Sequence, residues 1–344
     1  MPIITKPNQH FDVTTYTGNG ANNRTISSNL TPDLVWMKDR TNAYSHILID
    51  SIRGTGRYLA TNTTNNENWA DNIFPNSGPT TDGFIVDGGL NVSINANGDS
   101  YVAWQWNAGG ANTTNTDGSV TSTVRVNQTA GFSIVSYASG SAGQKTIGHG
   151  LGVTPSMIIT KSRSGSTFNW SIYHSSVIDT TSKFLRFTTD GIVTSATIWG
   201  AALPTSTVFG ITSDNGVEVN TNCIAYCWAP VAGYSAFGSY TGNGSTNGPF
   251  IYTGFRPRFV LVKLTSSGGE DWALSDGARD PINVVDSFLA PNANSTEATG
   301  AGAYVDYLSN GFKVRTDNPR YNGSSGTYIY AAFAEAPFKY ANAR

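Results

Sequence analysis

Residues 31–40 have the sequence TPDLVWMKDR, in which a proline is followed by a short, mostly apolar run that ends near a lysine. The same pattern returns as TPSMIITKSR at 154–163 and as RPRFVLVKLT at 256–265. Apolar runs rich in β-branched and aromatic residues favour extended strands, and a proline is tolerated where a strand begins. Three copies of one strand signature in a single chain indicate a repeated fold.

Three further landmarks accompany each copy. An aromatic segment precedes it, a second apolar run follows, and an aromatic strand closes the unit. The separations between copies agree from landmark to landmark, which favours tandem repeats over coincidence. Tyr16, Tyr137 and Tyr240 are separated by 121 and 103 residues, and Lys38, Lys161 and Lys263 by 123 and 102.

The composition is typical of an all-β protein. Charged residues make up only 13 % of the chain, whereas it contains 37 Gly, 16 Tyr, 16 Phe and 8 Trp. Aromatic residues suit pleated surfaces, and Gly, Asn and Ser suit the tight turns between strands. Short strands with turn signals, in units of about a hundred residues, predict three tandem β-sandwich or jelly-roll repeats.

The repeat boundaries follow from the landmarks. We predict an extended N-terminal arm at 1–10 and a Gly/Thr/Asn-rich linker at 108–131, because the first interval exceeds the second by about that length. The predicted sandwiches are residues 11–107, 132–233 and 234–344. Cys223 and Cys227, four residues apart in a strand, are too distant to bridge each other and are interpreted as packing residues.

The repeated lysines are interpreted as structural. Lys38, Lys161 and Lys263 each end an apolar run, where a charge would solvate the end of a sheet. Twelve or thirteen residues later the corresponding positions hold Asp50, His174 and Asp276, which could form salt bridges with the lysines in two units but not in the same way in the third.

The sequence contains no recognisable catalytic or metal-binding pattern. Its four histidines form no zinc motif, and neither a nucleophile elbow nor a phosphate-binding loop is present. We therefore predict no enzyme activity, no catalytic residue, no metal and no cofactor. A net charge of −2 gives no general affinity for nucleic acid or anionic membranes, and no apolar run is long enough for a membrane span.

Aromatic residues outside the repeated strands are the candidate binding residues. Trp69, Trp199 and Tyr321 lie in polar, Gly/Asn-rich surroundings, where exposed rings could stack on sugars or contact another protein. The alternative is that these rings fold back over an edge of a sandwich.

The blocks LVWMKDR, HILIDSIRGTGRYL and GDSYVAWQWNAGG in the first unit resemble a repeated module, a domain of unknown function, found in virion structural proteins of tailed bacteriophages, especially marine phages and cyanophages. IGHGLGVTPSMIITKSR in the second unit and YTGFRPRFVLVK in the third are similar to the same module. The resemblance covers nearly the whole chain from Phe11. It implies a lectin-like β-sandwich in each unit and a place in the virion, made in the cytoplasm of the host bacterium, and it brings no catalytic residues.

The expected function is therefore that of a non-enzymatic virion protein, displayed on the particle as a tail or fibre-tip adhesin. Its expected partners are other tail or capsid proteins, with host-surface glycan as a candidate ligand. A capsid decoration protein, a soluble carbohydrate-binding protein and a tail polysaccharide depolymerase remain alternatives. The oligomeric state is open between a monomer and a homotrimer.

Overall fold

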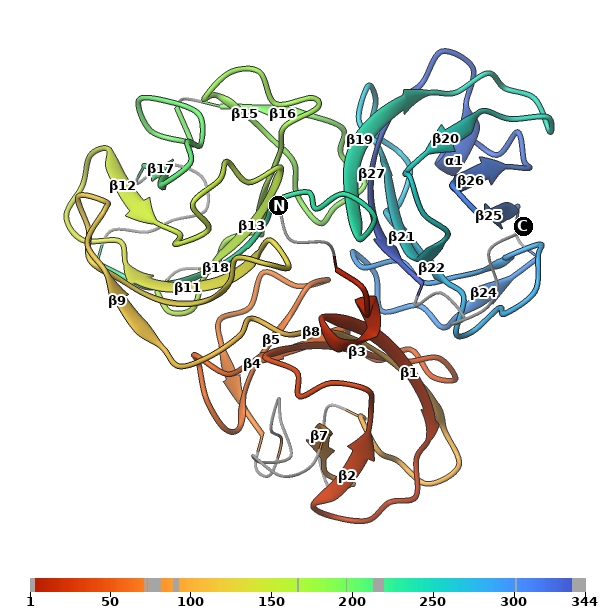
Figure 1. The fold of residues 1–344 in the computed structure, drawn as a ribbon, viewed down its shortest axis with the longest axis horizontal. Coiled ribbons are helices and arrows are strands. Elements are labelled where there is room, and N and C mark those ends of the chain that lie inside the picture. Colours follow the sequence, from red (N-terminus) through yellow and green to blue (C-terminus); the bar gives the residue numbers. More distant parts are fainter. Residues whose placement is uncertain are drawn as a thin grey trace.

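The structure is a computed structural model that describes residues 4–70, 73, 82–88, 93–165, 167–195, 197–212, 220–300 and 302–335. Antiparallel strands form nearly all of its regular structure, which confirms the predicted all-β sandwich fold. Figure 1 shows three β-rich lobes around a common centre. We call residues 4–107 lobe 1, residues 113–233 lobe 2 and residues 234–335 lobe 3. Within the described residues, no helix has the length and apolar character needed to cross a membrane.

The strands are short and evenly distributed among the lobes. Lobe 1 contains the 3-10 turn η1 (Pro7–Gln9) and β1 (Phe11–Thr17), β2 (Arg24–Ser27), β3 (Leu34–Asp39), β4 (Ile47–Asp50), β5 (Arg57–Ala60), β6 (Asn68–Trp69), β7 (Gly83–Val86) and β8 (Ser100–Trp106). Lobe 2 contains β9 (Thr113–Asn115), β10 (Ser122–Asn127), β11 (Phe132–Ala138), β12 (Lys145–Gly148), β13 (Met157–Ser162), β14 (Ser171–His174), β15 (Lys183–Phe184), β16 (Val193–Thr194), β17 (Val208–Ile211) and β18 (Asn222–Trp228). Lobe 3 contains β19 (Ser235–Thr241), β20 (Phe250–Tyr252), β21 (Pro257–Leu264), β22 (Ala273–Asp276), β23 (Ser287–Phe288), β24 (Ala298–Thr299), β25 (Val305–Leu308), β26 (Gly311–Val314), the helical turn α1 (Pro319–Asn322) and β27 (Thr327–Ala334).

Each lobe has a principal sheet with the same strand order. The orders are β1-β8-β3-β4, β11-β18-β13-β14 and β19-β27-β21-β22, so the closing aromatic strand always lies between the opening strand and the strand of the Pro–apolar–Lys signature. The pairing register also corresponds, which lets positions in one lobe be matched to positions in another. Leu34, Met157 and Phe259 lie opposite Trp106, Trp228 and Phe333, respectively.

The principal sheets pack their inward faces against one another at the centre of the molecule. Trp106 lies 5.9 Å from Trp228 and 5.6 Å from Phe333, measured between ring centroids, so aromatic rings of all three lobes meet. Only a small apolar cavity of about 20 Å³ remains between the three sheets. Because buried aromatic area dominates the stability of such a core, the centre holds the three lobes together.

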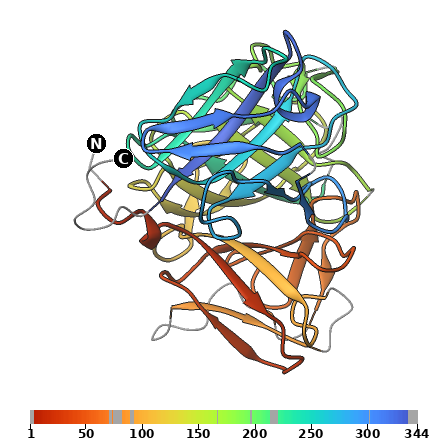
Figure 2. The same ribbon diagram turned by 90° about the vertical axis from the view of Figure 1, so that its right-hand side faces the viewer.

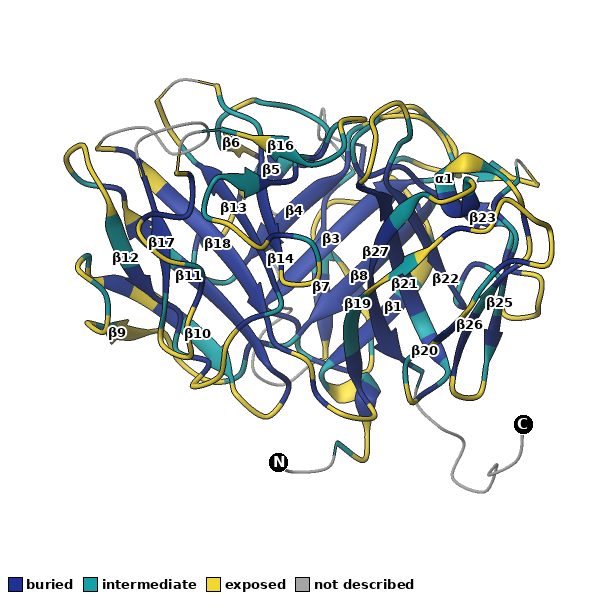
Figure 3. Cartoon of the chain, turned by 90° about the horizontal axis from the view of Figure 1, so that it is seen from above, coloured by how far each residue is buried: buried dark blue, intermediate teal, exposed yellow. Residues whose placement is uncertain are grey.

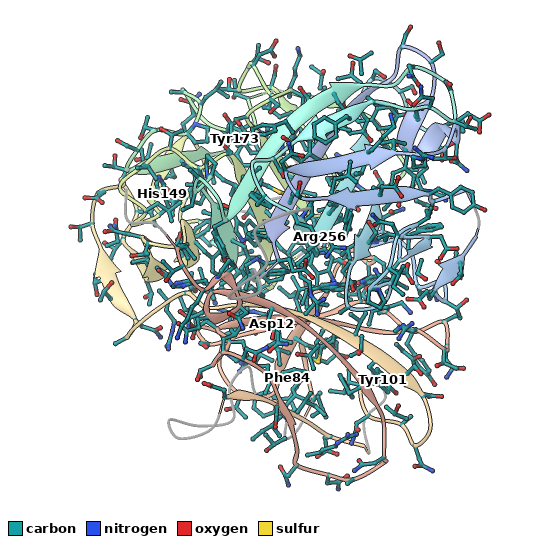
Figure 4. All side chains as sticks on the ribbon, turned by 45° about the vertical axis from the view of Figure 1, so that its right-hand side comes forward. Asp12, Phe84, Tyr101, His149, Tyr173 and Arg256 are labelled. Carbon is teal, nitrogen blue, oxygen red and sulfur yellow. The ribbon has the colours of Figure 1, made fainter. Side chains whose placement is uncertain are left out.

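The opposite face of each principal sheet is covered within its own lobe, which completes the sandwich. In lobe 1, Val35 and Met37 of β3 pack with Phe84 of β7 in a separate buried cluster. Figure 4 labels Phe84 in lobe 1, and the side view in Figure 2 shows how the strands of this lobe (red to orange) are layered. The covering sheets are β2-β7 in lobe 1, β12-β17 in lobe 2 and β20-β26-β25 in lobe 3.

Corresponding backbone contacts join each lobe to the next. The amide of Glu67 in lobe 1 donates to the carbonyl of Arg163 in lobe 2, at 2.9 Å. The same bond joins Ile192 of lobe 2 to Thr265 of lobe 3 at 2.9 Å. It joins Glu297 of lobe 3 to Arg40 of lobe 1 at 3.0 Å. Lobe 1 thus contacts lobe 2, lobe 2 contacts lobe 3, and lobe 3 contacts lobe 1, which closes a ring.

Side chains at one further set of corresponding positions cross the same junctions. Asp50, His174 and Asp276 occupy the same register position on β4, β14 and β22. The Tyr226 hydroxyl of lobe 2 donates to Asp50 at 2.8 Å, and the Trp104 indole of lobe 1 donates to Asp276 at 3.0 Å. His174 Nε2 instead lies 3.2 Å from the Tyr330 carbonyl of lobe 3.

Two junctions carry buried ion pairs. In junction 1/2, Arg53 pairs with Asp50 and Glu67 pairs with Arg163 at 2.8 Å. In junction 3/1, Arg279 lies 2.7 Å from Asp276 and 2.8 Å from Glu297, whose other oxygen pairs with Arg40 at 2.7 Å. In junction 2/3 the positions that correspond to these acids and arginines hold His174, Val177, Ile192 and Thr265.

The segment predicted to be a linker, residues 108–131, is instead part of a sheet. Its strands β9 and β10 extend the principal sheet of lobe 2, with β10 paired to β11 along its whole length. Arg125 on β10 pairs with the buried Asp33 of lobe 1 at 2.7 Å. Alternating residues of β10 such as Val124 and Val126 form an apolar face that packs with the core, and this pattern outweighs the turn-rich composition.

The described part of the N-terminal segment is folded onto the body rather than extended. Pro7 is buried in η1, and His10 packs edge-on against Tyr234 with ring centroids 6.0 Å apart. Asn127 Nδ2 lies 3.1 Å from His10 Nδ1, so the segment contacts both other lobes.

The three repeated lysines are buried, which corrects the expectation that they solvate the ends of sheets. Lys38, Lys161 and Lys263 are at most 1 % exposed. Each ammonium donates to loop carbonyls: that of Lys38 to Asp39 and Asn42, that of Lys161 to Thr64 and Phe168, and that of Lys263 to Glu270. Burial lowers the pKa of each lysine to about 8. The acids expected to pair with the lysines, Asp50 and Asp276, pair with arginines instead.

Candidate functional site

A polar pocket of about 150 Å³ opens at the edge of the principal sheet of lobe 1. Strands β4, β5 and β6 supply part of its wall, and the loops before β4 and after β5 supply the rest. Figure 3 shows β5 and β6 at one end of the molecule, with β9, β10 and β20 towards the other. The lining residues are Tyr44, Ser45, Ile47, Tyr58, Ala60, Thr63, Asn65, Asn66 and Asn68.

Strand alternation decides which side chains of β5 and β6 face this pocket. Tyr58 pairs with Asn68, and Arg57 pairs with Trp69. Because successive side chains point to opposite faces of a sheet, Tyr58 and Asn68 share the pocket face while Arg57 and Trp69 share the other.

Four polar groups of the lining make no hydrogen bond with the described part of the chain. They are the hydroxyls of Tyr44 and Tyr58 and the side-chain amides of Asn65 and Asn68. Tyr44 is 43 % exposed at the mouth, whereas Tyr58 is half-buried, and burial raises its pKa. Two neutral aromatic rings and two amides therefore have polar groups available to a ligand.

Two further polar atoms belong to lining residues of the pocket. Thr63 Oγ1 and Asn66 Oδ1 are buried and have no hydrogen-bond partner among the described residues. An unpaired buried polar atom costs about 1–3 kcal/mol, so a small side-chain rotation towards a ligand would recover part of that free energy.

Lobe 2 holds the loop that forms the outer wall of the pocket. The Lys161 ammonium donates to the Thr64 carbonyl at 3.0 Å, and Asn66 Nδ2 donates to the Gly165 carbonyl at 2.7 Å. The Trp170 indole donates to the Ala60 carbonyl at 2.9 Å. A wall fixed by a neighbouring lobe is preorganised, which reduces the entropy lost on ligand binding.

The acidic residue of this loop, Glu67, has its negative charge balanced by neighbouring arginines. Glu67 lies 2.8 Å from Arg163, 3.1 Å from Arg57 and 3.6 Å from Arg53. Its carboxylate is thus surrounded by arginines and is not among the residues that line the pocket. The pocket consequently presents neutral polar groups and aromatic rings.

Of the three predicted binding aromatics, only Trp69 is exposed. It is 57 % exposed, with the Arg57 guanidinium 5.3 Å from its ring, on the sheet face opposite to the pocket. Trp199 and Tyr321 are each 1 % exposed, so they are not exposed binding aromatics, and the alternative that these rings fold back into the sandwich describes them better. Trp199 donates to the Lys183 carbonyl and packs against Tyr173, and Tyr321 is buried in α1.

The pocket residues were missed because their signal is weak in sequence. The run TNTTNNEN at 61–68 is polar throughout, and Tyr44 and Tyr58 are ordinary residues beside a predicted strand. Only the pairing register and the contacts with lobe 2 bring these positions together. Within the described residues, no three His, Cys, Asp or Glu side chains are grouped to hold a metal ion.

The fold and the pocket define an all-β protein made of packed sandwiches, with a neutral polar pocket at its surface. The chain belongs to the family described as Domain of unknown function (DUF7483), whose model matches residues 6–337. No curated protein and no solved structure matches the chain.

Proposed function

We propose that this chain is a non-enzymatic structural protein of a tailed-phage virion, displayed on the particle as a tail or fibre-tip element that contacts host-surface glycan. The resemblance of its repeated blocks to phage virion modules supports a place in the virion. The observation that carries the proposal is the closed ring of lobes with a preorganised pocket at one end. Recognition residues gather on loops that a rigid scaffold positions, and this arrangement provides such a scaffold.

The ring also bears on the oligomeric state. A trimeric fibre tip has to bury apolar faces between three chains, whereas here the three central faces are buried within one chain. We therefore propose that a single chain takes the place of a trimer and occupies a three-fold position as a monomer.

Purified particles from an infected culture test the proposal. Mass spectrometry should detect the chain in particles, and image reconstruction should place it at the distal end of the tail or its fibres. Absence of the chain from particles that contain the known structural proteins would contradict a virion role.

A capsid decoration protein is the second candidate, and the three-lobed ring favours it specifically. Three corresponding lobes in one chain match a local three-fold axis of a shell without requiring three separate chains. Copy number distinguishes the two candidates, since a decoration protein is present in tens to hundreds of copies and a fibre tip in a few. Density on the shell would favour decoration over the tail proposal.

A further inference from the structure

An aromatic ring at one corresponding position of each lobe is covered by an arginine in lobes 2 and 3 but not by any described arginine in lobe 1. The register of Leu59, Leu185 and Leu289 against β4, β14 and β22 places Tyr58, Phe184 and Phe288 at corresponding positions. In lobe 2 the Arg186 guanidinium lies 4.9 Å from the Phe184 ring centroid. In lobe 3 Arg320 lies 4.5 Å from the Phe288 ring centroid.

Among the described residues, no such arginine lies over Tyr58 in lobe 1. The position that corresponds to Arg186 is Ala60, a residue of the pocket wall. Phe184 and Phe288 are buried, whereas Tyr58 is half-buried and forms part of the pocket. Cations cover aromatic faces because the ring face is electron-rich, and a covered face is closed to other ligands. The three lobes therefore share the backbone arrangement at this position but differ in whether an arginine covers the aromatic ring.

We propose that this pocket binds a neutral saccharide residue, with its ring packed on Tyr58 and its hydroxyl groups paired with the amides of Asn65 and Asn68. The inference specifies the kind of sugar bound in the glycan contact of the proposed function. It rests on the proposed function only for where that sugar comes from, the host surface. A sugar ring has an apolar C–H face and a rim of hydroxyl groups, which is the chemistry that an aromatic ring beside amides accommodates.

The size and charge of the pocket narrow the ligand further. A volume of about 150 Å³ is below the ~300 Å³ at which drug-sized pockets begin, so the pocket accommodates one ring-sized unit. None of the described lining side chains is a carboxylate, an ammonium or a guanidinium. An acidic sugar would lose hydration on entry without gaining a cationic partner, and the arrangement therefore favours neutral sugars. The described lining also lacks the carboxylic acid needed to protonate a glycosidic oxygen, so the inference is binding without cleavage.

The decisive variant reproduces the arginine of lobe 2. Ala60→Arg places a guanidinium at the position from which Arg186 covers Phe184, and it should fill the pocket while keeping the backbone carbonyl that accepts from Trp170. Tyr44→Ala removes an exposed ring at the mouth, with little cost to folding. Trp69→Ala is the matched control, because it removes an exposed neighbouring aromatic from the opposite face of the sheet.

The full-length protein is titrated by calorimetry with glucose, galactose, N-acetylglucosamine and maltose, and with glucuronic acid and sialic acid as charged comparisons. We expect at least one neutral sugar to bind, with the affinity lowered about tenfold or more by Ala60→Arg and by Tyr44→Ala and unchanged by Trp69→Ala. Circular dichroism and thermal unfolding confirm that each variant is folded.

Three results would overturn the inference: no neutral sugar binds, only acidic sugars bind, or folded Ala60→Arg binds as well as the unmodified protein. Each of them leaves the virion role intact, because that role is decided by the composition of purified particles. Conversely, sugar binding that Ala60→Arg abolishes, in a chain absent from particles, would retain the pocket and refute the virion proposal. If the protein binds a free sugar but is not retained on host cells, the ligand of the pocket is a soluble saccharide rather than a host-surface glycan.

Discussion

The junctions between lobes differ in chemistry but not in backbone geometry. Junctions 1/2 and 3/1 contain buried arginine–carboxylate networks, whereas junction 2/3 has His174 and Ile192 at the corresponding positions. The backbone bond that joins neighbouring lobes is 2.9–3.0 Å at all three. The arrangement of the lobes is therefore set by the sheets and the central aromatic core, and the polar side chains adapt to a space that already exists.

The comparison also shows why the charged networks are complete. Burial acts most strongly on the Asp276 carboxyl and would raise its pKa, but Arg279 and the surrounding N–H donors, including the Trp104 indole, hold that pKa below its usual value. Glu297 has a lowered pKa for the same reason, with Arg40 and Arg279 outweighing burial. A buried ion pair gains little over an apolar contact, but the loss of one partner is costly.

The largest expected effect is the loss of a junction carboxylate. Asp276→Ala should reduce the free energy of unfolding by about 3–5 kcal/mol, because it removes the fully buried partner of the Arg279 guanidinium, leaving that cation only Glu297 as a carboxylate partner, and it leaves the Trp104 indole without its acceptor. Chemical denaturation monitored by tryptophan fluorescence measures the change. His174→Ala at the corresponding position of junction 2/3 is the matched control and should cost less, since no buried charge is left unpaired. Equal losses in the two variants would show that charge does not distinguish the junctions.

Acid should destabilise junction 2/3 through His174 at a pH at which Asp276 of junction 3/1 is still ionised. Burial lowers the pKa of His174 to about 4, and the Tyr330 carbonyl opposes this only in part. The unfolded chain takes up a proton at His174 near its ordinary pKa of about 6.5, so stability is unaffected above that pH and falls between about pH 6.5 and 4, by up to about 3 kcal/mol. Asp276 has a lowered pKa, and its contribution is lost only as the pH falls further, from below its ordinary value of about 4.

Thermal unfolding of the unmodified protein and of His174→Gln, recorded from pH 7 to pH 4, tests this order. Burial also lowers the pKa values of His10, His46 and His149, so the unmodified protein loses stability from several histidines. The variant keeps a donor for Tyr330 but cannot take up a proton. Its melting temperature should fall less over that range, and an identical pH profile would exclude His174 as a source of acid sensitivity.

Sequence reasoning predicted the architecture better than the contacts. The alternation and spacing around TPDLVWMKDR were sufficient for an all-β sandwich fold, and Cys223 and Cys227 are buried and unbridged, as expected for packing residues. Local composition was misleading where tertiary packing decides. Segment 108–131 has the residues of a linker, yet its alternating valines allow it to join a sheet.

The candidate site could not be predicted from the sequence for a related reason. Exposure of an aromatic residue depends on what lies over it, and nothing near Trp199 in sequence shows that Tyr173 covers it. Arginines from two different places cover the corresponding rings, Arg186 beside Phe184 in lobe 2 and Arg320 of α1 in lobe 3, and the described residues place neither over Tyr58. This difference becomes visible only once the lobes are matched by register. Trp69 is exposed, as expected, but it lies in strand β6 rather than in a loop, and its side chain is on the sheet face opposite to the pocket.

A charge introduced into junction 2/3 should have a smaller effect than the loss of Asp276. Ile192→Glu places a carboxylate where Glu297 lies in junction 3/1, but the corresponding arginine positions hold Val177 and Thr265. We expect a loss of about 2 kcal/mol in the free energy of unfolding, because a partly buried charge lacks a partner. Adding Thr265→Arg should restore part of it, with a coupling free energy of about 1 kcal/mol in a double-mutant cycle. Strict additivity would show that junction 2/3 has no room for the ion pair.

The smallest expected effect comes from making junction 3/1 resemble junction 2/3. Arg40→Thr introduces the residue found at the corresponding position 265, and it removes an arginine whose side chain is 25 % exposed. Glu297 keeps its pair with the fully buried Arg279, so the loss should be at most about 1 kcal/mol. Partly exposed ion pairs are screened by salt, and the Debye length in 0.5 M sodium chloride is only ~4 Å. The difference between variant and unmodified protein should therefore shrink when urea denaturation is repeated at that salt concentration. A loss as large as that of Asp276→Ala, or one that salt leaves unchanged, would mean that Arg40 is an essential part of the buried network. The expected result would instead show that the large loss of stability comes from the fully buried pair of Asp276 with Arg279. The partly exposed pair of Arg40 with Glu297 would then add little to a contact that the backbone already forms.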